Sequence, residues 1–193
     1  MEKENKLAKF LLQKYADLIN EREQRTIGEI KSLVDGTDLT IQNLVNDFKP
    51  EFYDFKKDYL EVLKKVYAFV TTEIDFVETN FGVNYWLSAK EVLDVKVVDD
   101  EDMAVFVCAC AKALGDDNSE VIIAELDNLK THAFVITEYN DKFILLDAAA
   151  KINFEKYSGK KVDIIKNYEF KTNKIKRFLY RFNSNKYEQF LEE

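Results

Sequence analysis

Three side chains that could act together in chemistry stand in the middle of the chain: Asp100, His132 and Asp147. His132 is the only histidine of the protein. We expect Asp100 at the start of a helix, His132 at the start of a strand and Asp147 at the end of the next strand. Antiparallel strands place their residues side by side, so a hairpin would bring Asp147 close to His132. An aspartate beside a histidine orients the ring and favours imidazolium, as in a nucleophile–histidine–acid arrangement.

The elements that must position these side chains are indicated by the hydrophobic pattern. The apolar run MAVFVCACAKAL at residues 103–114 predicts a buried helix that Gly115 ends. Three strands rich in β-branched residues are expected after it, over 121–126, 131–138 and 142–146. The pair Asn140-Asp141 would turn the second strand into the third. This order of elements predicts that the start of the helix, the start of the second strand and the end of the third strand lie close together.

The first 80 residues are predicted to be helical. Apolar residues recur every three or four positions across 7–34, which is typical of amphipathic helices. Gly36 ends this stretch, and Asp38 can cap a short helix. Pro50 would lie in the first turn of a helix, where proline is tolerated, and a long amphipathic helix is expected over 52–77. We interpret the apolar stripes as packing surface.

The composition is that of a folded protein. Of 193 residues, 47% are hydrophobic and 25 are Phe or Tyr, which excludes disorder as the dominant state. This length suits one domain with a helical extension, and we expect the extension at 1–80 and the core at 81–193. No apolar run approaches the roughly 20 residues that span a bilayer, so no membrane segment is expected. The charged amino terminus does not read as a secretory signal, which predicts a cytoplasmic protein.

Charge is distributed unevenly along the chain. The formal net charge is −8, which argues against a general nucleic-acid binder. Residues 1–150 hold 17 Lys and Arg against 30 Asp and Glu, whereas residues 151–193 hold 11 against 6. The basic segment interleaves lysines with aromatic residues and includes a strand-like run at 176–182. Such a pattern can bind single-stranded nucleic acid, but we favour a half-buried sheet whose lysines contact solvent or the acidic part of the same chain.

Several short motifs follow one another in a recognisable order: Tyr85-Trp86, Glu91, Val98-Asp99-Asp100-Glu101-Asp102, Ala113-Leu114-Gly115, His132-Ala133-Phe134-Val135 and Leu145-Leu146-Asp147-Ala148. With them, residues 84–147 resemble the transglutaminase-like superfamily of papain-type folds. The pattern is closest to the bacterial transglutaminase-like cysteine proteinases. The resemblance implies an α+β fold, a papain-like core in which a helix packs on an antiparallel sheet. It also implies that Trp86 flanks a cleft, where it could contact a peptide-like ligand, although a packing role fits this residue equally well. Asn80 and Asn84 are candidates for the oxyanion donor.

The sequence departs from this family at the nucleophile, because the family's cysteine falls on Asp100. A helix start and a nearby imidazolium stabilise a thiolate, and they can hold a carboxylate equally well. A carboxylate that attacked an amide would form an anhydride, a much poorer intermediate than a thioester. Cys108 and Cys110 lie on the order of 12–15 Å further along the helix axis and do not replace the lost thiol. They are interpreted as packing residues.

Two functional hypotheses follow. The first is a catalytically degenerate protein that binds a protein or peptide ligand or serves as a structural module, without cofactor or metal. The alternative is a hydrolase in which Asp100, His132 and Asp147 support metal-dependent or acid–base chemistry. In a metal site, the nearby Asp99, Glu101 and Asp102 could add ligands. The acidic cluster could equally be charge that favours a helix start. The helices of the first 80 residues could wrap the core, cover the cleft or form a homo-oligomer interface, and the sequence does not choose among these roles.

Overall fold

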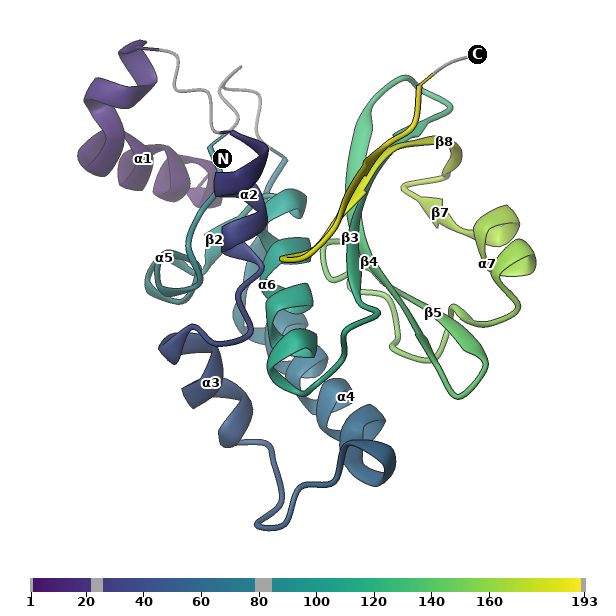
Figure 1. Ribbon diagram of the computed structural model, residues 1–193. Coiled ribbons are helices and arrows are strands. Elements are labelled where there is room, and N and C mark those ends of the chain that lie inside the picture. Colours follow the sequence, from purple (N-terminus) through teal and green to yellow (C-terminus); the bar gives the residue numbers. More distant parts are fainter. Residues whose placement is uncertain (1, 22–25, 79–84, 192–193) are drawn as a thin grey trace.

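The computed structural model describes residues 2–21, 26–78 and 85–191. Helices form a layer on one face of an antiparallel sheet, and a short helix lies on the other face (Figure 1). The helices of the first half are α1 (Glu2–Glu21), α2 (Ile27–Leu33), α3 (Leu39–Asn46), α4 (Phe55–Glu73) and α5 (Ala89–Val95). Two short parallel strands, β1 (Asp75–Phe76) and β2 (Val97–Val98), join the ends of α4 and α5.

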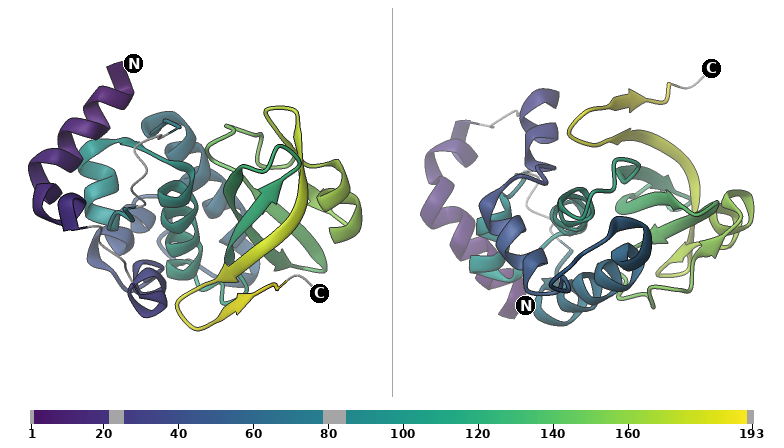
Figure 2. Two further views of the ribbon diagram at one scale, coloured as in Figure 1. Left: turned by 90° about the horizontal axis from the view of Figure 1, so that it is seen from above. Right: turned by 60° about the horizontal axis from the view of Figure 1, so that its bottom comes forward.

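Helix α6 (Asp100–Ala113) is the centre of the molecule. It lies between the other helices and the sheet, as Figure 2 shows from two further directions. Residues 102–111 of α6 are all buried, because α3 and α4 cover one side of the helix and β3 and β4 cover the other. Asp99 caps the helix, accepting a hydrogen bond from the amide of Asp102, and this cap places Asp100 in the first turn.

The sheet follows the predicted hairpins. Its strand order is β6-β5-β4-β3-β8-β7, and β9 pairs with β8. The register sets Ala124 opposite His132 and Val135 opposite Leu146. Helix α7 (Lys161–Asn167) lies on the face that α6 leaves open. The strands are β3 (Glu120–Leu126), β4 (Thr131–Tyr139), β5 (Lys142–Leu146), β6 (Ser158–Gly159), β7 (Glu169–Phe170), β8 (Asn173–Phe182) and β9 (Tyr187–Gln189).

Most predicted elements are confirmed, including the three central strands and the short helix that Asp38 caps. The long helix predicted over 52–77 was wrong at both ends, because α4 runs only from Phe55 to Glu73. Asp54 caps it by accepting from the Lys56 amide, so Pro50 lies in the preceding loop and Phe52 is exposed to solvent. One hydrophobic core extends from Leu7 in α1 to β8. The division of the chain near residue 80 stays a prediction.

Gly36, in the loop between α2 and α3, lies against the backbone of the last turn of α6. A Cβ atom at this position would lie 2.7 Å from the backbone nitrogen of Ala113, so alanine forces the two backbones apart. We expect Gly36→Ala to lower the free energy of unfolding by about 1–3 kcal/mol, measured by urea denaturation. The matched control is Gly28→Ala, where the nearest atom would be 3.8 Å away. Equal effects of the two substitutions would contradict this contact.

Candidate functional site

The structure brings Asp100, His132 and Asp147 into one chain of polar contacts. Nδ1 of His132 lies 2.6 Å from Oδ2 of Asp100, and Nε2 lies 3.0 Å from Oδ2 of Asp147. The imidazole therefore stands between two carboxylates, one from the first turn of α6 and one from the residue that follows β5. The His132 side chain is 1% exposed and that of Asp147 is fully buried, whereas that of Asp100 is 20% exposed. Of these three side chains, that of Asp100 is therefore the one that faces solvent.

Asp100 is held by two donors. Its Oδ2 accepts from the ring of His132 and, at 2.8 Å, from the backbone amide of Ala133. The two donors are adjacent residues near the start of β4, so the carboxylate connects the first turn of α6 to the beginning of that strand. This contact explains how a residue 32 positions before the histidine reaches it.

Asp147 accepts three hydrogen bonds. Its Oδ2 receives the ring of His132 and the hydroxyl of Tyr168 at 2.6 Å, and its Oδ1 receives the amide of Ala150 at 3.0 Å. Its backbone carbonyl accepts from the hydroxyl of Tyr67 in α4. A buried carboxylate needs this many donors, because they replace the water that it loses on folding.

The two carboxylates keep His132 protonated. Burial by itself lowers the pKa of the imidazole, but the hydrogen bonds to Asp100 and Asp147 outweigh it and raise the pKa to about 9. At neutral pH both ring nitrogens therefore carry a proton and both donate. No ring nitrogen is left to accept a proton as a general base.

An aromatic cover lies on the ring of His132. Phe170 of β7 stacks on it with the ring centroids 3.6 Å apart and the planes 14° from parallel. Lys171 lies over the Phe170 ring and forms an ion pair with Glu78 at 2.8 Å. Glu78 also pairs with Lys130 at 2.8 Å, and hydrogen bonds from the two lysines lower its pKa to about 2. Three separate segments therefore meet above the histidine.

Comparisons with known proteins show a likeness in fold. No protein-family model matches the sequence, and no curated protein matches it. The structure is similar to LapG of Legionella pneumophila, with a TM-score of 0.54 and 16% identity over 86% of this chain and 88% of that one. A calcium-bound LapG structure matches with a TM-score of 0.54 and 17% identity over the same shares. The chain has the fold of LapG. This likeness confirms the predicted α+β fold.

Trp86 lies in the segment that precedes α5. Its side chain is buried and packs edge-on against Phe182 of β8, with the ring centroids 5.9 Å apart. The contacts described for it are packing contacts, so its predicted role beside a ligand stays a prediction. Asn80 and Asn84, the candidates for an oxyanion donor, lie outside the described residues.

Both cysteines are free and buried in α6. Burial raises the pKa of Cys108 to about 12 and raises that of Cys110 as well, so neither thiol is ionised at neutral pH. Their interpretation as packing residues is confirmed.

The acidic cluster at the start of α6 forms internal contacts that sequence reasoning missed. Asp102 is buried, and its carboxylate accepts from the amide of Leu87 at 2.7 Å. Burial and the neighbouring Asp100 raise the pKa of Asp99 to about 7, and burial also raises that of Asp102. Across residues 2–21, 26–78 and 85–191, no group of three or more His, Cys, Asp or Glu side chains could hold a metal ion.

The basic segment contacts acidic residues of the same chain. Its ion pairs reach back to β1, to the segment after it and to β3: Lys151 with Asp75, Lys171 with Glu78, and both Lys176 and Arg177 with Glu125. These pairs agree with the interpretation that its cations dock on the acidic half. Within the described ranges no helix has the length and apolarity to cross a bilayer.

Proposed function

We propose that this chain is a catalytically degenerate transglutaminase-like protein that serves as a non-catalytic binding or structural module. One observation carries the proposal: the carboxylate of Asp100 is bonded to one nitrogen of His132 while Asp147 is bonded to the other. In a nucleophile–histidine–acid triad the first of these positions belongs to the nucleophile and the second to the orienting acid. Here the first position holds an anion that is already paired.

The chemistry of the pair supports this proposal. Oδ2 of Asp100 accepts from the His132 ring and the Ala133 amide, so an attack on a carbonyl would have to break charge-assisted hydrogen bonds. Such an attack on an amide would yield an anhydride and would still need a proton for the leaving amine. The protonated His132 could donate that proton and, once neutral, could accept one from water, so the obstacle to turnover is the paired carboxylate at position 100 and the anhydride that it would form. The Asp100–His132 pair is therefore better suited to stabilising the fold than to hydrolysing an amide.

The alternative is a hydrolase with metal-dependent or acid–base chemistry at Asp100, His132 and Asp147. It needs a free imidazole nitrogen or an open set of carboxylate oxygens. Both nitrogens of His132 face carboxylates, and Asp147 accepts three hydrogen bonds. These contacts give the non-catalytic reading the stronger support. A stoichiometric metal in the purified protein would favour the alternative.

Further parts of the proposal concern the setting of the molecule. We propose a cytoplasmic protein whose ligand is a protein or a peptide, whose partners do not include nucleic acid, and whose amino-terminal helices could join two copies. The ion pairs between the basic segment and Asp75, Glu78 and Glu125 support the exclusion of nucleic acid, because they neutralise cations that phosphates would need.

Restoring the thiol tests the proposal. In Asp100→Cys the new thiol would face the His132 imidazolium, so we expect a thiolate with an apparent pKa below about 7 and rapid alkylation by iodoacetamide. The matched control is Glu101→Cys, one residue further along α6 and outside the contact with the ring. Its thiol should react with a pKa nearer about 8.5. Mass spectrometry of tryptic peptides across a pH series measures both rates.

The same variants test catalysis. Wild-type protein should not cleave fluorescently labelled casein, because position 100 carries no thiol. Cleavage by the wild type at a rate comparable to that of Asp100→Cys would overturn the proposal. Equal alkylation of the two cysteine variants would show that His132 does not stabilise an anion at position 100.

A further inference from the structure

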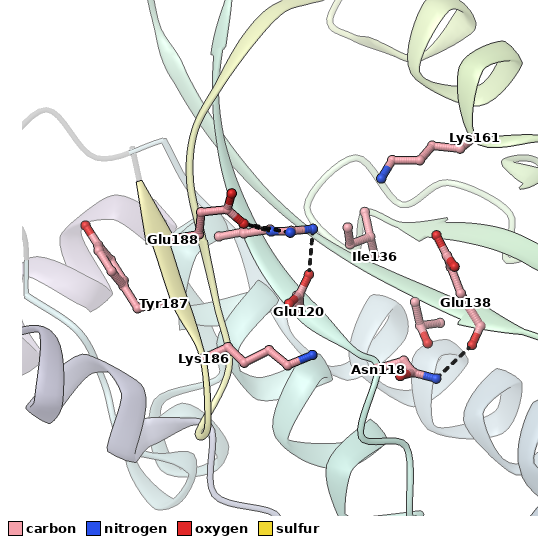
Figure 3. A pocket seen from close by; sticks show the side chains of 10 residues that line it. Asn118, Glu120, Ile136, Glu138, Lys161, Lys186, Tyr187 and Glu188 are labelled. Carbon is pink, nitrogen blue, oxygen red and sulfur yellow. Dashed lines mark hydrogen bonds and ion pairs between the residues drawn. The ribbon is translucent and has the colours of Figure 1, made fainter. Parts of the chain in front are cut away.

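One face of β4 carries His132, Phe134 and Ile136, because side chains alternate between the two faces of a strand. At Ile136 this face lines a hollow of about 500 Å³, which Figure 3 shows. At His132 the face is closed, because the ring of Phe170 stacks on the imidazole. The two ends of the same strand face therefore differ, and the aromatic cover lies at the end that carries the candidate site.

The cover belongs to an extended segment that contacts both His132 and its acid partner. Tyr168 and Phe170 are two residues apart, so their side chains lie on the same side of this segment. The hydroxyl of Tyr168 donates to Asp147 at 2.6 Å, and the ring of Phe170 lies 3.6 Å from the imidazole, centroid to centroid. The segment therefore supports the histidine and its acid together.

The ring of Phe170 is itself held in place. It is buried, and Phe76 packs edge-on against it with the ring centroids 6.1 Å apart. Its backbone pairs with Asn173 of β8, whose side-chain amide also donates to the Phe170 carbonyl at 3.3 Å. These contacts come from β1 and β8, so the position of the ring does not depend on the imidazole alone.

The stacking fixes the plane of the imidazole. Nδ1 and Nε2 lie in this plane, 2.6 Å from Asp100 and 3.0 Å from Asp147. Rotation about the Cβ–Cγ bond of His132 would turn both N–H groups away from their acceptors and would press the edge of the imidazole against Phe170. The planes of the two rings are only 14° from parallel, so Phe170 favours the orientation in which both hydrogen bonds form.

The face of Phe170 also suits the charge of the imidazolium. The face of an aromatic ring is the negative part of its quadrupole, and it attracts a cation that lies over it. A purely apolar cover would only keep water away and would disfavour the charged form. A phenyl ring keeps water away and still attracts the positive charge.

Other charged groups surround this stack. The ammonium of Lys171 lies 5.3 Å from the centroid of the Phe170 ring, and Glu78 compensates its charge at 2.8 Å. The titratable groups around the histidine and its cover come from α6, from the residue after β5, from the segment around β7, from the residues after β1 and from the turn before β4: Asp100, Asp147, Tyr168, Lys171, Glu78 and Lys130.

We propose that Phe170 is a positioning residue for His132, whose ring face holds the imidazolium in the plane that reaches both Asp100 and Asp147. The inference deepens the proposed function and rests on it only through the contact between Asp100 and His132. It gives β7 a part in the candidate site beyond packing.

NMR titration of His132 in variants of the full chain tests this inference. Phe170→Leu keeps an apolar cover but has no ring face, so the titration midpoint should fall by about 0.5–1 pH unit. Phe170→Tyr keeps the ring and should keep the midpoint of the wild type. The matched control is Phe143→Leu in the same hydrophobic cluster, where the ring lies under the ammonium of Lys161; its midpoint should equal that of the wild type.

A second measurement needs no variant. In the wild type, the ring protons of His132 should resonate upfield of those of free imidazole, because they lie over the face of Phe170. Resonances without this shift would show that the two rings are not stacked and would overturn the inference.

Two outcomes of the titration would also overturn it. Equal midpoints in the wild type and Phe170→Leu would show that the ring only fills space. A higher midpoint in Phe170→Leu would show that Phe170 acts by excluding water, since burial by itself lowers the pKa of the imidazole. The alkylation of Asp100→Cys tests the proposed function separately: an unreactive thiol there, together with a lowered midpoint in Phe170→Leu, would contradict the proposed function and support this inference.

Discussion

Asp147→Ala is expected to lower the free energy of unfolding by about 3–5 kcal/mol, the usual cost of removing one partner from a buried ion pair. The substitution leaves the His132 imidazolium and the hydroxyl of Tyr168 without the acceptor that they share, and it removes the acceptor of the Ala150 amide. Burial keeps water from replacing the lost oxygens. Urea denaturation at pH 7 measures the effect.

Two other substitutions make this result specific. Asp147→Asn keeps the size of the side chain and one acceptor oxygen, so it should cost less than alanine while still removing the charge. Asp163→Ala removes an exposed carboxylate on α7 and should change the stability by no more than about 0.5 kcal/mol. A cost for Asp147→Ala as small as that for Asp163→Ala would contradict the buried network.

The free energy of unfolding is expected to fall by about 3 kcal/mol between pH 6.5 and pH 9 because of His132. Its pKa is raised from 6.5 to about 9 by the folded structure. A group whose pKa is higher in the folded state stabilises fully below its unfolded pKa, and this contribution is lost as the pH rises through the folded value. The folded protein holds the proton that the unfolded chain releases above pH 6.5.

Because the protein has a single histidine, the pKa of His132 can be measured directly. Only one set of imidazole NMR signals exists, so the titration of His132 needs no assignment. Its midpoint should lie near pH 9 in the wild type and fall in Asp100→Asn, which removes one of the two carboxylates, and the loss of stability above pH 6.5 should shrink with it. A midpoint near 6.5 in the wild type would show that neither carboxylate holds the ring as described.

A second group, Asp99, also lowers the free energy of unfolding as the pH rises, but over a lower pH range. The pKa of Asp99 is raised to about 7, so its protonated form is favoured by folding and its contribution is lost between about pH 4 and pH 7. Burial also raises the pKa of Asp102, so the NMR titration of the ring, rather than the slope of stability with pH, identifies the contribution of His132.

The local pattern of residues was enough to predict the elements that carry the site. Apolar runs and turn residues indicated α6 and the three central strands, and the order of Asp100, His132 and Asp147 along them indicated that the three would meet. These features depend on neighbours within a few positions, such as the Asp99 cap at the start of α6. The resemblance of motifs spread over 84–147 added the fold class, which the likeness to LapG confirms.

Contacts between distant segments could not be predicted in this way. Tyr168 and Phe170 contact Asp147 and His132 from a segment that shows no strong periodicity, and nothing near Glu78 in the sequence indicates its pairing with Lys130 and Lys171. The protonation of His132 depends on two carboxylates that lie 32 positions before it and 15 positions after it. Such properties arise from burial and from distances of 2.6–3.0 Å across the folded chain, which the residue types and their spacing do not specify.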